Sequence, residues 1–327
     1  MSRPAIFRAV RLRAAMEPVE LARAGRSAPG LTRRHCMGGF ACGFAAIRPG
    51  GSAAGAAAVH PRIATPDRAG TQTLLSLGLT PSAAVSKEFY DSMGATPAMP
   101  GSVVSCGNPV EPNLEVLAQL HVDLIVTGTI PPDGRDVLAR VAPVFHLDIY
   151  TGRDGALARA GDETLRLARL LGIEAAGHAY VADLARTIDR EAARLRTRPR
   201  RAVYIVGLAP DGRNMTVYGR NSIMHDVMVA LGVGNAWTGP TGGAGFTNTG
   251  IEELARNPKA DILHIDYGAG TDAALAKLAA SPFWTNLPMV QAGRVRRVPR
   301  FEVFGGLPLA AQFATLLADA LLGERAA

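Results

Sequence analysis

Cysteine is scarce in this chain, and long apolar runs are missing. Three of the 327 residues are cysteine, and two of them, Cys36 and Cys42, lie within the first 60 residues. Cys106 is left without an internal disulfide partner in the rest of the chain, so cysteine spacing indicates no redox compartment. No apolar run approaches the roughly 18 residues that a membrane-spanning helix needs. The body of the chain, residues 61–327, is therefore expected to be soluble.

Motifs for nucleotide binding and hydrolysis are also missing or weak. The chain has no G-x-x-x-x-G-K-[ST] phosphate loop, no G-x-S-x-G motif and no H-E-x-x-H pair. Residues 268–273 match G-x-G-x-x-A, but late in the chain and without an acidic residue about 20 positions later at a strand end. We interpret them as an ordinary loop before a helix. The His-x-Asp pairs at 146–148 and 264–266 are interpreted as hydrogen-bonded strand-end residues rather than metal ligands.

The positive charge of the chain is confined to its start. The net charge is +7, and residues 1–60 contain nine arginines and two glutamates. Residues 61–327 contain 26 basic and 26 acidic residues. Nucleic acids are bound through basic surfaces, so the body of the chain is not expected to bind DNA or RNA.

The first 60 residues are predicted to be an export signal with a disordered leader. Arg33 and Arg34 precede a weakly apolar run at 36–47, and small residues follow up to Ala58. A charged region, a short apolar region and a cleavage site of small residues are typical of a signal peptide. The arginine pair favours export by the twin-arginine route. The alternative is a disordered tail from a misassigned start codon. The residues before Cys42 are a poor match to a lipoprotein signal, so no lipid anchor is expected there.

From residue 61 onwards, short apolar runs alternate with helical patterns. This alternation predicts parallel strands covered by helices. Two helical patterns, at 156–171 and 175–195, run nearly back to back, and the second would be about 30 Å long. We predict two Rossmann-like α/β lobes, at 61–173 and 199–327, joined by one long interlobe helix within 174–198, with a ligand cleft between them.

A helix–strand unit repeats once in each predicted lobe. Residues 111–128 read as a short helix followed by a buried strand, and residues 250–268 repeat the pattern. Aligning Glu115 with Glu252 brings Asp123 within one residue of Asp261. Each unit therefore carries a carboxylate on its helix, and the match favours two similar lobes, each with an acidic docking point.

Two loops and one hairpin-like pair are also predicted from turn residues. A polar, glycine- and proline-rich loop is expected between Ser86 and Gly101, and a second loop at 234–250. Residues 290–299 are expected to form a hairpin-like pair around Ala292 and Gly293.

Six segments, in order and spacing, resemble the periplasmic siderophore-binding proteins of iron-uptake ABC transporters, and the ferric-hydroxamate type above all. The resemblance covers residues 62–323 and is carried by the joint order of the segments EPNLE at 111–115, LARVAP at 138–143, YGRNSI at 218–223, GNAWTG at 234–239, SPFW at 281–284 and QAGRVRRVP at 291–299.

The resemblance implies a non-enzymatic substrate-binding protein with two lobes, a rigid long helix and a shallow cleft. Such a protein captures a ferric siderophore in the periplasm and delivers it to an ABC permease in the inner membrane, which works with its ATPase. Glu115 and Glu252 fall at the positions that dock the permease. No cofactor is implied, because the siderophore itself carries the iron, and the protein is expected to act as a monomer.

The resemblance also indicates which residues form the cleft, and where this chain differs. Pro109 stands near the place of a cleft arginine of the family, and a tyrosine is replaced within residues 130–132. The candidate oxygen-binding side chains are Tyr90, Asn108 and Thr247, and the candidate apolar walls are Phe246 and Phe304. The remaining cleft candidates are Met93, Thr127, Tyr267 and Glu302.

The loss of an arginine and the presence of Glu302 favour a neutral or cationic ferric hydroxamate over an anionic catecholate or citrate complex. Two alternatives stay open at this point. One is a haem- or cobalamin-binding protein of the same architecture, and the other is a cytoplasmic α/β enzyme that binds a nucleotide at residues 268–273.

Overall fold

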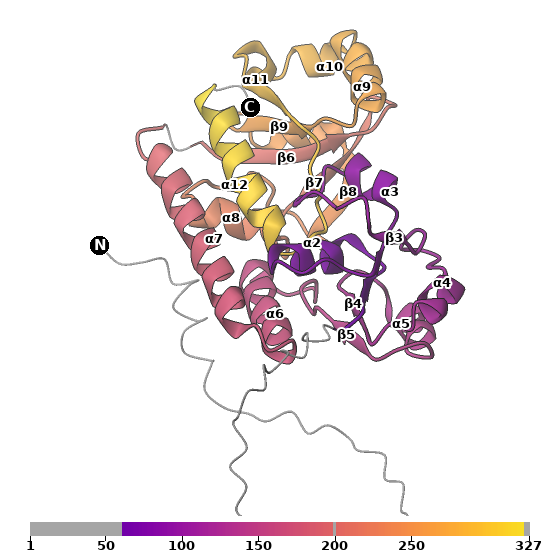
Figure 1. Ribbon diagram of the computed structural model, residues 1–327. Helices are drawn as coiled ribbons and strands as arrows, with labels where there is room; N and C mark the ends of the chain where they lie inside the picture. The colour runs from indigo at the N-terminus through magenta and orange to yellow at the C-terminus, as the bar shows by residue number, and fades with distance from the viewer. Residues whose placement is uncertain (1–60, 199–200, 324–327) are drawn as a thin grey trace, which may run out of the picture. The chain divides into compact units, whose positions relative to one another are not determined.

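A computed structural model describes residues 61–198 and 201–323, all of which belong to one compact unit (Figure 1). The predicted export signal and leader, residues 1–60, lie outside the described residues. None of the helices in the described part of the chain combines the length and the apolar character needed to cross a membrane.

The first half of the described chain builds a sheet of five parallel strands, in the order β3-β2-β1-β4-β5. Its central residues Ala64, Ile125 and Val126 are fully buried, as expected for a parallel sheet covered on both faces. The strands are β1 (Ile63–Thr65), β2 (Ala83–Ala84), β3 (Val104–Ser105), β4 (Leu124–Thr127) and β5 (Val144–His146). The helices between them are α2 (Arg68–Ser76), α3 (Lys87–Ser92), α4 (Leu114–Gln119) and α5 (Pro132–Leu138).

The second half builds a mixed sheet of five strands, in the order β10-β9-β6-β7-β8. Strands β6, β9 and β10 are parallel, and β7 and β8 extend the sheet in antiparallel fashion. The strands are β6 (Val203–Leu208), β7 (Asn214–Tyr218), β8 (Phe246–Gly250), β9 (Asp261–Ile265) and β10 (Val295–Val298). The shorter helices here are α8 (Ile223–Ala230), the 3-10 helix η1 (Ile251–Arg256), α9 (Ala269–Ala279), α10 (Pro282–Thr285) and α11 (Pro288–Gln291).

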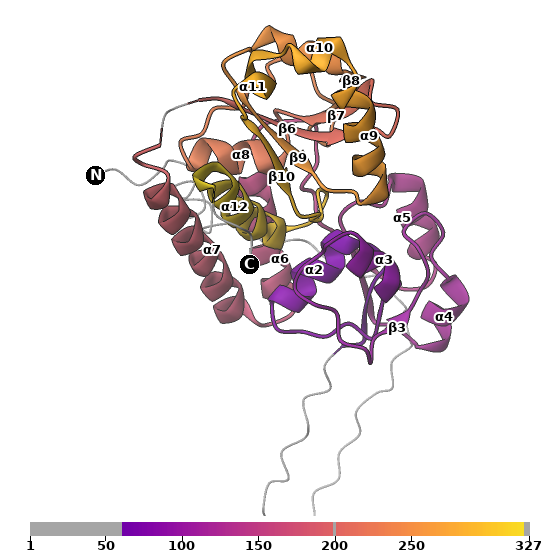
Figure 2. The ribbon, with the colours of Figure 1, turned by 90° about the horizontal axis from the view of Figure 1, so that it is seen from above.

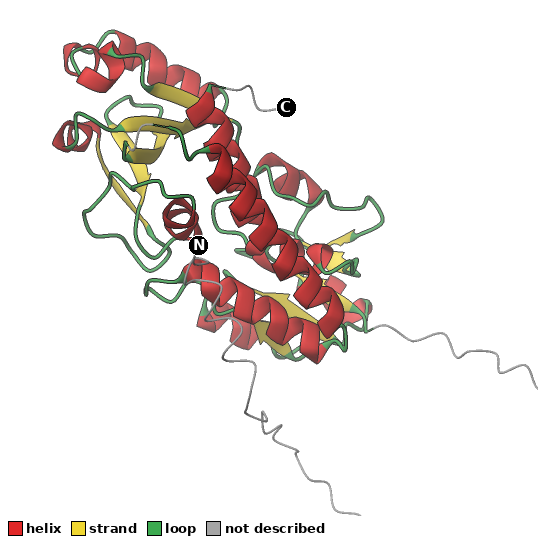
Figure 3. Cartoon of the chain, turned by 90° about the vertical axis from the view of Figure 1, so that its left-hand side faces the viewer, coloured by secondary structure: helices red, strands yellow, loops and turns green. Residues whose placement is uncertain are grey.

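Three longer helices join the two halves: α6 (Ala156–Leu170), α7 (Glu174–Arg194) and α12 (Leu307–Leu322). Helix α7 packs against α6 and α12, as Figure 3 shows from the side. Helix α12 also contacts β10 and α8 (Figure 2), and reaches back to α2. The long helix predicted at 175–195 is thus confirmed as a 21-residue helix.

One hydrophobic cluster runs through both halves. It includes Val126 from the first sheet and Ile205 from the second, with Leu184, Ile188 and Phe313 from the long helices between them. Burial of apolar surface is the main stabilising contribution to folding. Because the two sheets share this cluster, we expect the lobes to move little relative to each other.

The repeated helix–strand unit occupies equivalent places in the two sheets. Strand β4 lies between the first strand of its lobe, β1, and an edge strand, β5, and β9 lies in the same way between β6 and β10. The aspartates at the two strand starts also have similar partners. Asp123 pairs with Arg62 and Asp261 pairs with Arg198, each arginine preceding the first strand of its lobe.

Several sequence expectations are wrong in detail. The segment expected to be a loop after Ser86 contains α3, which Ser86 itself caps by accepting a hydrogen bond from the Phe89 amide. The loop expected at 234–250 contains β8, whose threonine and asparagine residues give little apolar signal. Residues 290–299 form no hairpin, because β10 pairs in parallel with β9. The repeat's second helix is the 3-10 helix η1, and the second sheet is mixed rather than parallel.

Helix α2 lies unusually close to β4, and Gly70 permits this approach. A Cβ atom at Gly70 would overlap the carbonyl oxygen of Val126, whereas a Cβ atom at Gly161, a helical glycine of α6, would meet no atom within 4 Å. The backbone of β4 cannot move away without disturbing its pairing with β1 and β5.

We therefore predict opposite effects for two glycine-to-alanine substitutions. Gly70→Ala should destabilise the protein by about 2 kcal/mol, because the overlap with β4 outweighs the higher helix propensity of alanine. Gly161→Ala should stabilise it by up to about 1 kcal/mol through that propensity alone. Urea unfolding followed by circular dichroism measures both changes. Equal stability of the two variants would contradict the close approach of α2 to β4.

Candidate ligand-binding site

A cavity of about 540 Å³ lies between the two halves of the described chain. Both halves contribute to its walls, as the predicted cleft requires. The lining residues of the first half are Arg68, Gly128, Thr129, Ile130, Pro131, Pro132, Arg135, His146, Asp148 and Tyr150, and those of the second half are Gly243, Ala244, Phe246 and Phe304.

The wall from the first half is built where strands β4 and β5 end. Residues 128–132 follow β4, and Arg135 lies one turn further along α5. His146, Asp148 and Tyr150 come from the end of β5 and the segment after it. Ligands of parallel α/β sheets bind at the carboxyl ends of the strands, and the cavity follows that rule.

The wall from the second half is largely aromatic. The rings of Phe246 and Phe304 have centroids 5.2 Å apart, and Phe304 meets the ring of Tyr150 edge-on at 6.2 Å. The Tyr150 hydroxyl donates a hydrogen bond of 2.7 Å to the carbonyl of Gly305. Burial raises the pKa of Tyr150 well above its ordinary value, so the hydroxyl keeps its proton. The cavity therefore has an apolar wall with a fixed phenol at its edge.

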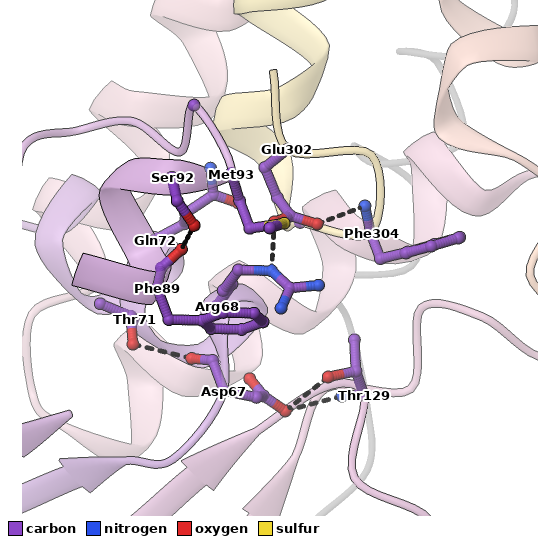
Figure 4. A network of polar contacts seen from close by, with 12 residues as sticks. Asp67, Arg68, Thr71, Gln72, Phe89, Ser92, Met93, Thr129, Glu302 and Phe304 are labelled. Carbon is purple, nitrogen blue, oxygen red and sulfur yellow. Dashed lines mark hydrogen bonds and ion pairs between the residues drawn. The ribbon is translucent and has the colours of Figure 1, made fainter. Parts of the chain in front are cut away.

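Asp67 holds the floor of the cavity in place. One carboxylate oxygen accepts hydrogen bonds from the amides of Gly128 and Thr129, at 2.8 and 2.7 Å, and from the Thr127 hydroxyl. The other oxygen accepts a bond of 2.8 Å from the Gly70 amide and caps α2. One buried carboxylate thus ties the start of α2 to the loop after β4 (Figure 4).

Arg68, the first residue of α2, carries its guanidinium into the cavity wall. Its Nε atom pairs with the carboxylate of Glu302, and its guanidinium lies 4.7 Å above the ring centroid of Phe89 (Figure 4). Glu302 is 1% exposed, and its second oxygen accepts a hydrogen bond of 2.8 Å from the amide of Phe304. The ion pair therefore joins α2 to the segment between β10 and α12.

His146 is a second titratable group of the cavity whose pKa is shifted. Burial lowers the pKa of His146, and the nearby Arg135 lowers it further, so the imidazole is neutral at neutral pH. The Nδ1 atoms of His146 and His264 are buried without a hydrogen-bond partner among the described residues. The expectation that these histidines are hydrogen-bonded near a strand end is therefore not met at their Nδ1 atoms.

Two of the nine predicted cleft residues line the cavity, Phe246 and Phe304. Glu302 lies directly behind the wall, buried against Arg68. Thr127 is also buried, and its hydroxyl is bound to Asp67 rather than directed at a ligand. The expectation that Glu302 presents its charge to the ligand is thus wrong, because its carboxylate is paired inside the protein.

The other predicted cleft residues lie outside this lining. Tyr90 is fully buried, and its hydroxyl donates to the carbonyl of Pro97. Asn108 is exposed and closes a turn by accepting hydrogen bonds from the amides of residues 110 and 111. Met93 contacts Arg300 through its sulfur atom at 3.2 Å. Thr247 belongs to β8 and is not part of the lining.

Tyr267 lines a second cavity, of about 440 Å³, in the second half of the chain. Gly207 and Gly270 belong to the same lining. The guanidinium of Arg300 lies 5.1 Å above the Tyr267 ring. Residue 270 belongs to the G-x-G-x-x-A segment. The interpretation of this segment as a loop before a helix is wrong, because only Gly268 precedes α9 and residues 269–273 form its first turns.

Sequence reasoning missed most of the lining of the larger cavity, and the missed residues include Arg68, Thr129, Arg135, His146, Asp148 and Tyr150. A usable signal was present for the last five, which lie at or after the ends of β4 and β5, where parallel sheets bind ligands. Arg68 gave no such signal, because only the folded chain brings it to Glu302. Within residues 61–198 and 201–323, no group of three or more His, Cys, Asp or Glu side chains is placed to hold a metal ion.

Glu115 and Glu252, the two predicted docking residues, are both exposed. Glu115 lies in the first turn of α4 and accepts a hydrogen bond from Gln119. Glu252 lies in the first turn of η1. Each belongs to the element that precedes the equivalent strand of its sheet, β4 or β9.

Known proteins resemble this chain over most of its length. The iron(3+)-hydroxamate-binding protein FhuD of Escherichia coli (strain K12) is 31% identical over 270 residues, which cover 82% of this chain and 90% of FhuD. The Fe3+–Desferal-bound siderophore-binding protein FhuD from Vibrio cholerae has a similar structure, with a TM-score of 0.74 and 27% identity. That match covers 80% of this chain and 98% of the Vibrio protein.

A more distant structure shares the fold. The triscatecholate siderophore-binding protein FeuA from Bacillus subtilis, complexed with ferri-bacillibactin, matches with a TM-score of 0.64 and 17% identity. The match covers 81% of this chain and 94% of FeuA. These likenesses confirm the predicted fold of two α/β lobes joined by a long helix.

The model of the periplasmic binding proteins matches residues 63–300. This family consists of substrate-binding proteins, so the alternative of a nucleotide-using enzyme is wrong. The span of that match and the identity to the E. coli protein show that this chain belongs to the periplasmic binding protein family.

Proposed function

We propose that this protein is the substrate-binding component of an ABC importer that captures a ferric siderophore, with the hydroxamate type favoured. One observation carries the proposal: a chain 31% identical to an iron(3+)-hydroxamate-binding protein has a cavity between its lobes whose walls combine aromatic rings with guanidinium groups. Both FhuD relatives support the hydroxamate class, since one is named for it and the other is bound to Fe3+–Desferal.

The cavity suits a ligand of this kind in size and chemistry. Its volume of about 540 Å³ is within the range of roughly 300–1,000 Å³ for small-molecule sites. Phe246, Phe304 and Tyr150 supply apolar surface for the organic scaffold. Arg68 and Arg135 supply N–H donors for oxygen atoms at the iron centre. The siderophore holds the iron, so the protein needs no iron ligands of its own.

Glu302 does not add a negative charge to the surface that faces the ligand. Glu302 was expected to make the cleft unfavourable for anions, but it is buried and paired with Arg68. The preference for hydroxamates therefore rests on the FhuD relatives and not on a negative charge in the cleft.

Delivery to a membrane permease completes the proposed role. Glu115 and Glu252, exposed on equivalent elements of the two lobes, would dock basic pockets of the permease, which works with its ATPase. The protein would act as a monomer in the periplasm after removal of the leader at 1–60. The first lobe would end at residue 173 and the second would begin at residue 199, with the interlobe helix between them.

A second candidate is haem binding, and His146 is the observation that favours it. Its imidazole is neutral and lines the cavity, which are the properties of an iron ligand. Titration of the purified protein distinguishes the candidates, because an added haem would develop a Soret band on binding.

The first prediction from the proposed function concerns the class of ligand. Calorimetric titration of residues 61–327 with a ferric trihydroxamate should give a dissociation constant of about 1 µM or tighter. Haem, cobalamin and ferric tris-catecholates should bind more weakly. Tight binding of haem or a tris-catecholate, with no binding of hydroxamates, would overturn the proposal.

The second prediction concerns the aromatic wall. Phe304→Ala should weaken ferric-hydroxamate binding by roughly tenfold, because the ring that contacts Phe246 and Tyr150 is lost. Phe283→Ala is the matched control, since Phe283 is exposed on α10 and away from the cavity. Calorimetry measures both variants. Equal affinities of the two variants would place the ligand elsewhere.

The third prediction concerns docking. Glu115→Arg and Glu252→Arg should each lower siderophore uptake by reconstituted permease, and the double variant by roughly tenfold or more, because like charges would meet at the contact. Siderophore affinity should not change. Asp189→Arg, at an exposed position of α7, is the control for surface charge. Full uptake by the double variant would show that these glutamates do not dock the permease.

A further inference from the structure

Arg68 and Glu302 form an ion pair that is held from several sides. Arg68 is 15% exposed at its side chain and Glu302 only 1%. The ring of Phe89 covers one face of the guanidinium, and the amide of Phe304 binds the second carboxylate oxygen. Burial of a charge is costly unless an opposite charge lies beside it, so each partner depends on the other.

The pair sits at the point where the two lobes meet the cavity. Arg68 begins α2 of the first lobe, and its neighbour Asp67 anchors the loop that floors the cavity. Glu302 lies in the segment that enters α12. Nearby, the amide of Gly306 donates a hydrogen bond of 3.3 Å to Gln72 of α2. The guanidinium is therefore fixed relative to both walls.

The orientation of Arg68 leaves its terminal nitrogens for a ligand. Glu302 engages the Nε atom, and Figure 4 shows the two Nη atoms on the side of the guanidinium that points away from Glu302. Arg68 belongs to the cavity lining. A planar guanidinium with fixed N–H groups is suited to bidentate contact with paired oxygen atoms, such as those of an iron-bound hydroxamate.

We propose that Arg68 donates hydrogen bonds to the iron-bound oxygens of the ligand, and that Glu302 is a specificity-determining residue that positions Arg68 and balances its charge. This inference rests on the proposed function. It assigns the donor role to a residue at the start of α2, in place of the arginine that is absent near Pro109.

The balanced charge has a consequence for ligand choice. With Glu302 ionised, the pair adds no net charge to the cavity wall, so neutral and cationic ferric hydroxamates are not repelled. Removing the carboxylate charge leaves Arg68 as an uncompensated cation beside the ligand. An uncompensated cation attracts anionic complexes and repels cationic ones over the few ångströms that separate it from the ligand.

The test compares two probe ligands in the native protein and in Glu302→Gln. The probes are iron(III)–desferrioxamine B, a cationic trihydroxamate, and ferric enterobactin, an anionic tris-catecholate. Glutamine keeps the size of the side chain and its bond to the Phe304 amide. The ratio of the two dissociation constants, anionic over cationic, should fall by roughly tenfold or more in Glu302→Gln.

Glu191→Gln is the matched control. Glu191 is also 1% exposed and is paired with Arg190 and Arg194, but it lies on α7 outside the cavity lining. Its substitution should leave the ratio of dissociation constants unchanged. A fall of similar size in both variants would overturn the assignment, because it would show a general effect of lost charge.

A double variant tests the donor role of Arg68 without leaving a buried charge unpaired. Arg68→Met/Glu302→Gln removes both charges together, and thermal unfolding checks that it folds. Its affinity for iron(III)–desferrioxamine B should fall by roughly tenfold or more. Native affinity in the double variant, or an unchanged ratio in Glu302→Gln, would overturn the inference alone. Failure of the native protein to bind either probe would overturn the proposed function instead.

Discussion

The buried carboxylate of Asp67 is the interaction on which the ligand-binding region depends. A buried carboxylate is tolerated only when its oxygens accept hydrogen bonds. Here one oxygen caps α2, and the other accepts hydrogen bonds from the hydroxyl of Thr127 and the amides of Gly128 and Thr129. These hydrogen bonds determine where α2 begins and which path the loop after β4 takes. Arg68 follows directly, so its position in the cavity wall is a consequence of this cap.

The lobes are joined by more than the long helix. A common hydrophobic cluster passes from one sheet to the other through α6, α7 and α12. Polar contacts add to it around the cavity: the Gly152 amide binds the carbonyl of Gly243, and Arg68 pairs with Glu302. A binding protein built in this way holds its cavity largely preformed, and ligand recognition depends on the chemistry of fixed walls more than on closure of the lobes.

Prediction from the sequence was accurate where the signal was local and failed where it was not. The helix at 175–195 was found within one residue at each end because its apolar residues recur with helical spacing over many turns. Helix α3 and strand β8 were missed because six and five residues carry too little periodicity. Of the predicted site residues, Phe246 and Phe304 line the cavity. Thr127 and Tyr90 have side chains suited to a ligand, but their hydroxyls form hydrogen bonds inside the protein.

The sequence by itself determined the two α/β lobes, the long helix between them and the repeated unit that carries Glu115 and Glu252, since apolar periodicity and turn residues act over short stretches of chain. Only the tertiary structure decided what the cavity presents to a ligand. The charge of Glu302 reads as a feature of the cleft in the sequence, yet folding buries it against Arg68, a residue far away along the chain. The free energy of a charge depends on its surroundings in three dimensions, and no local pattern records those surroundings.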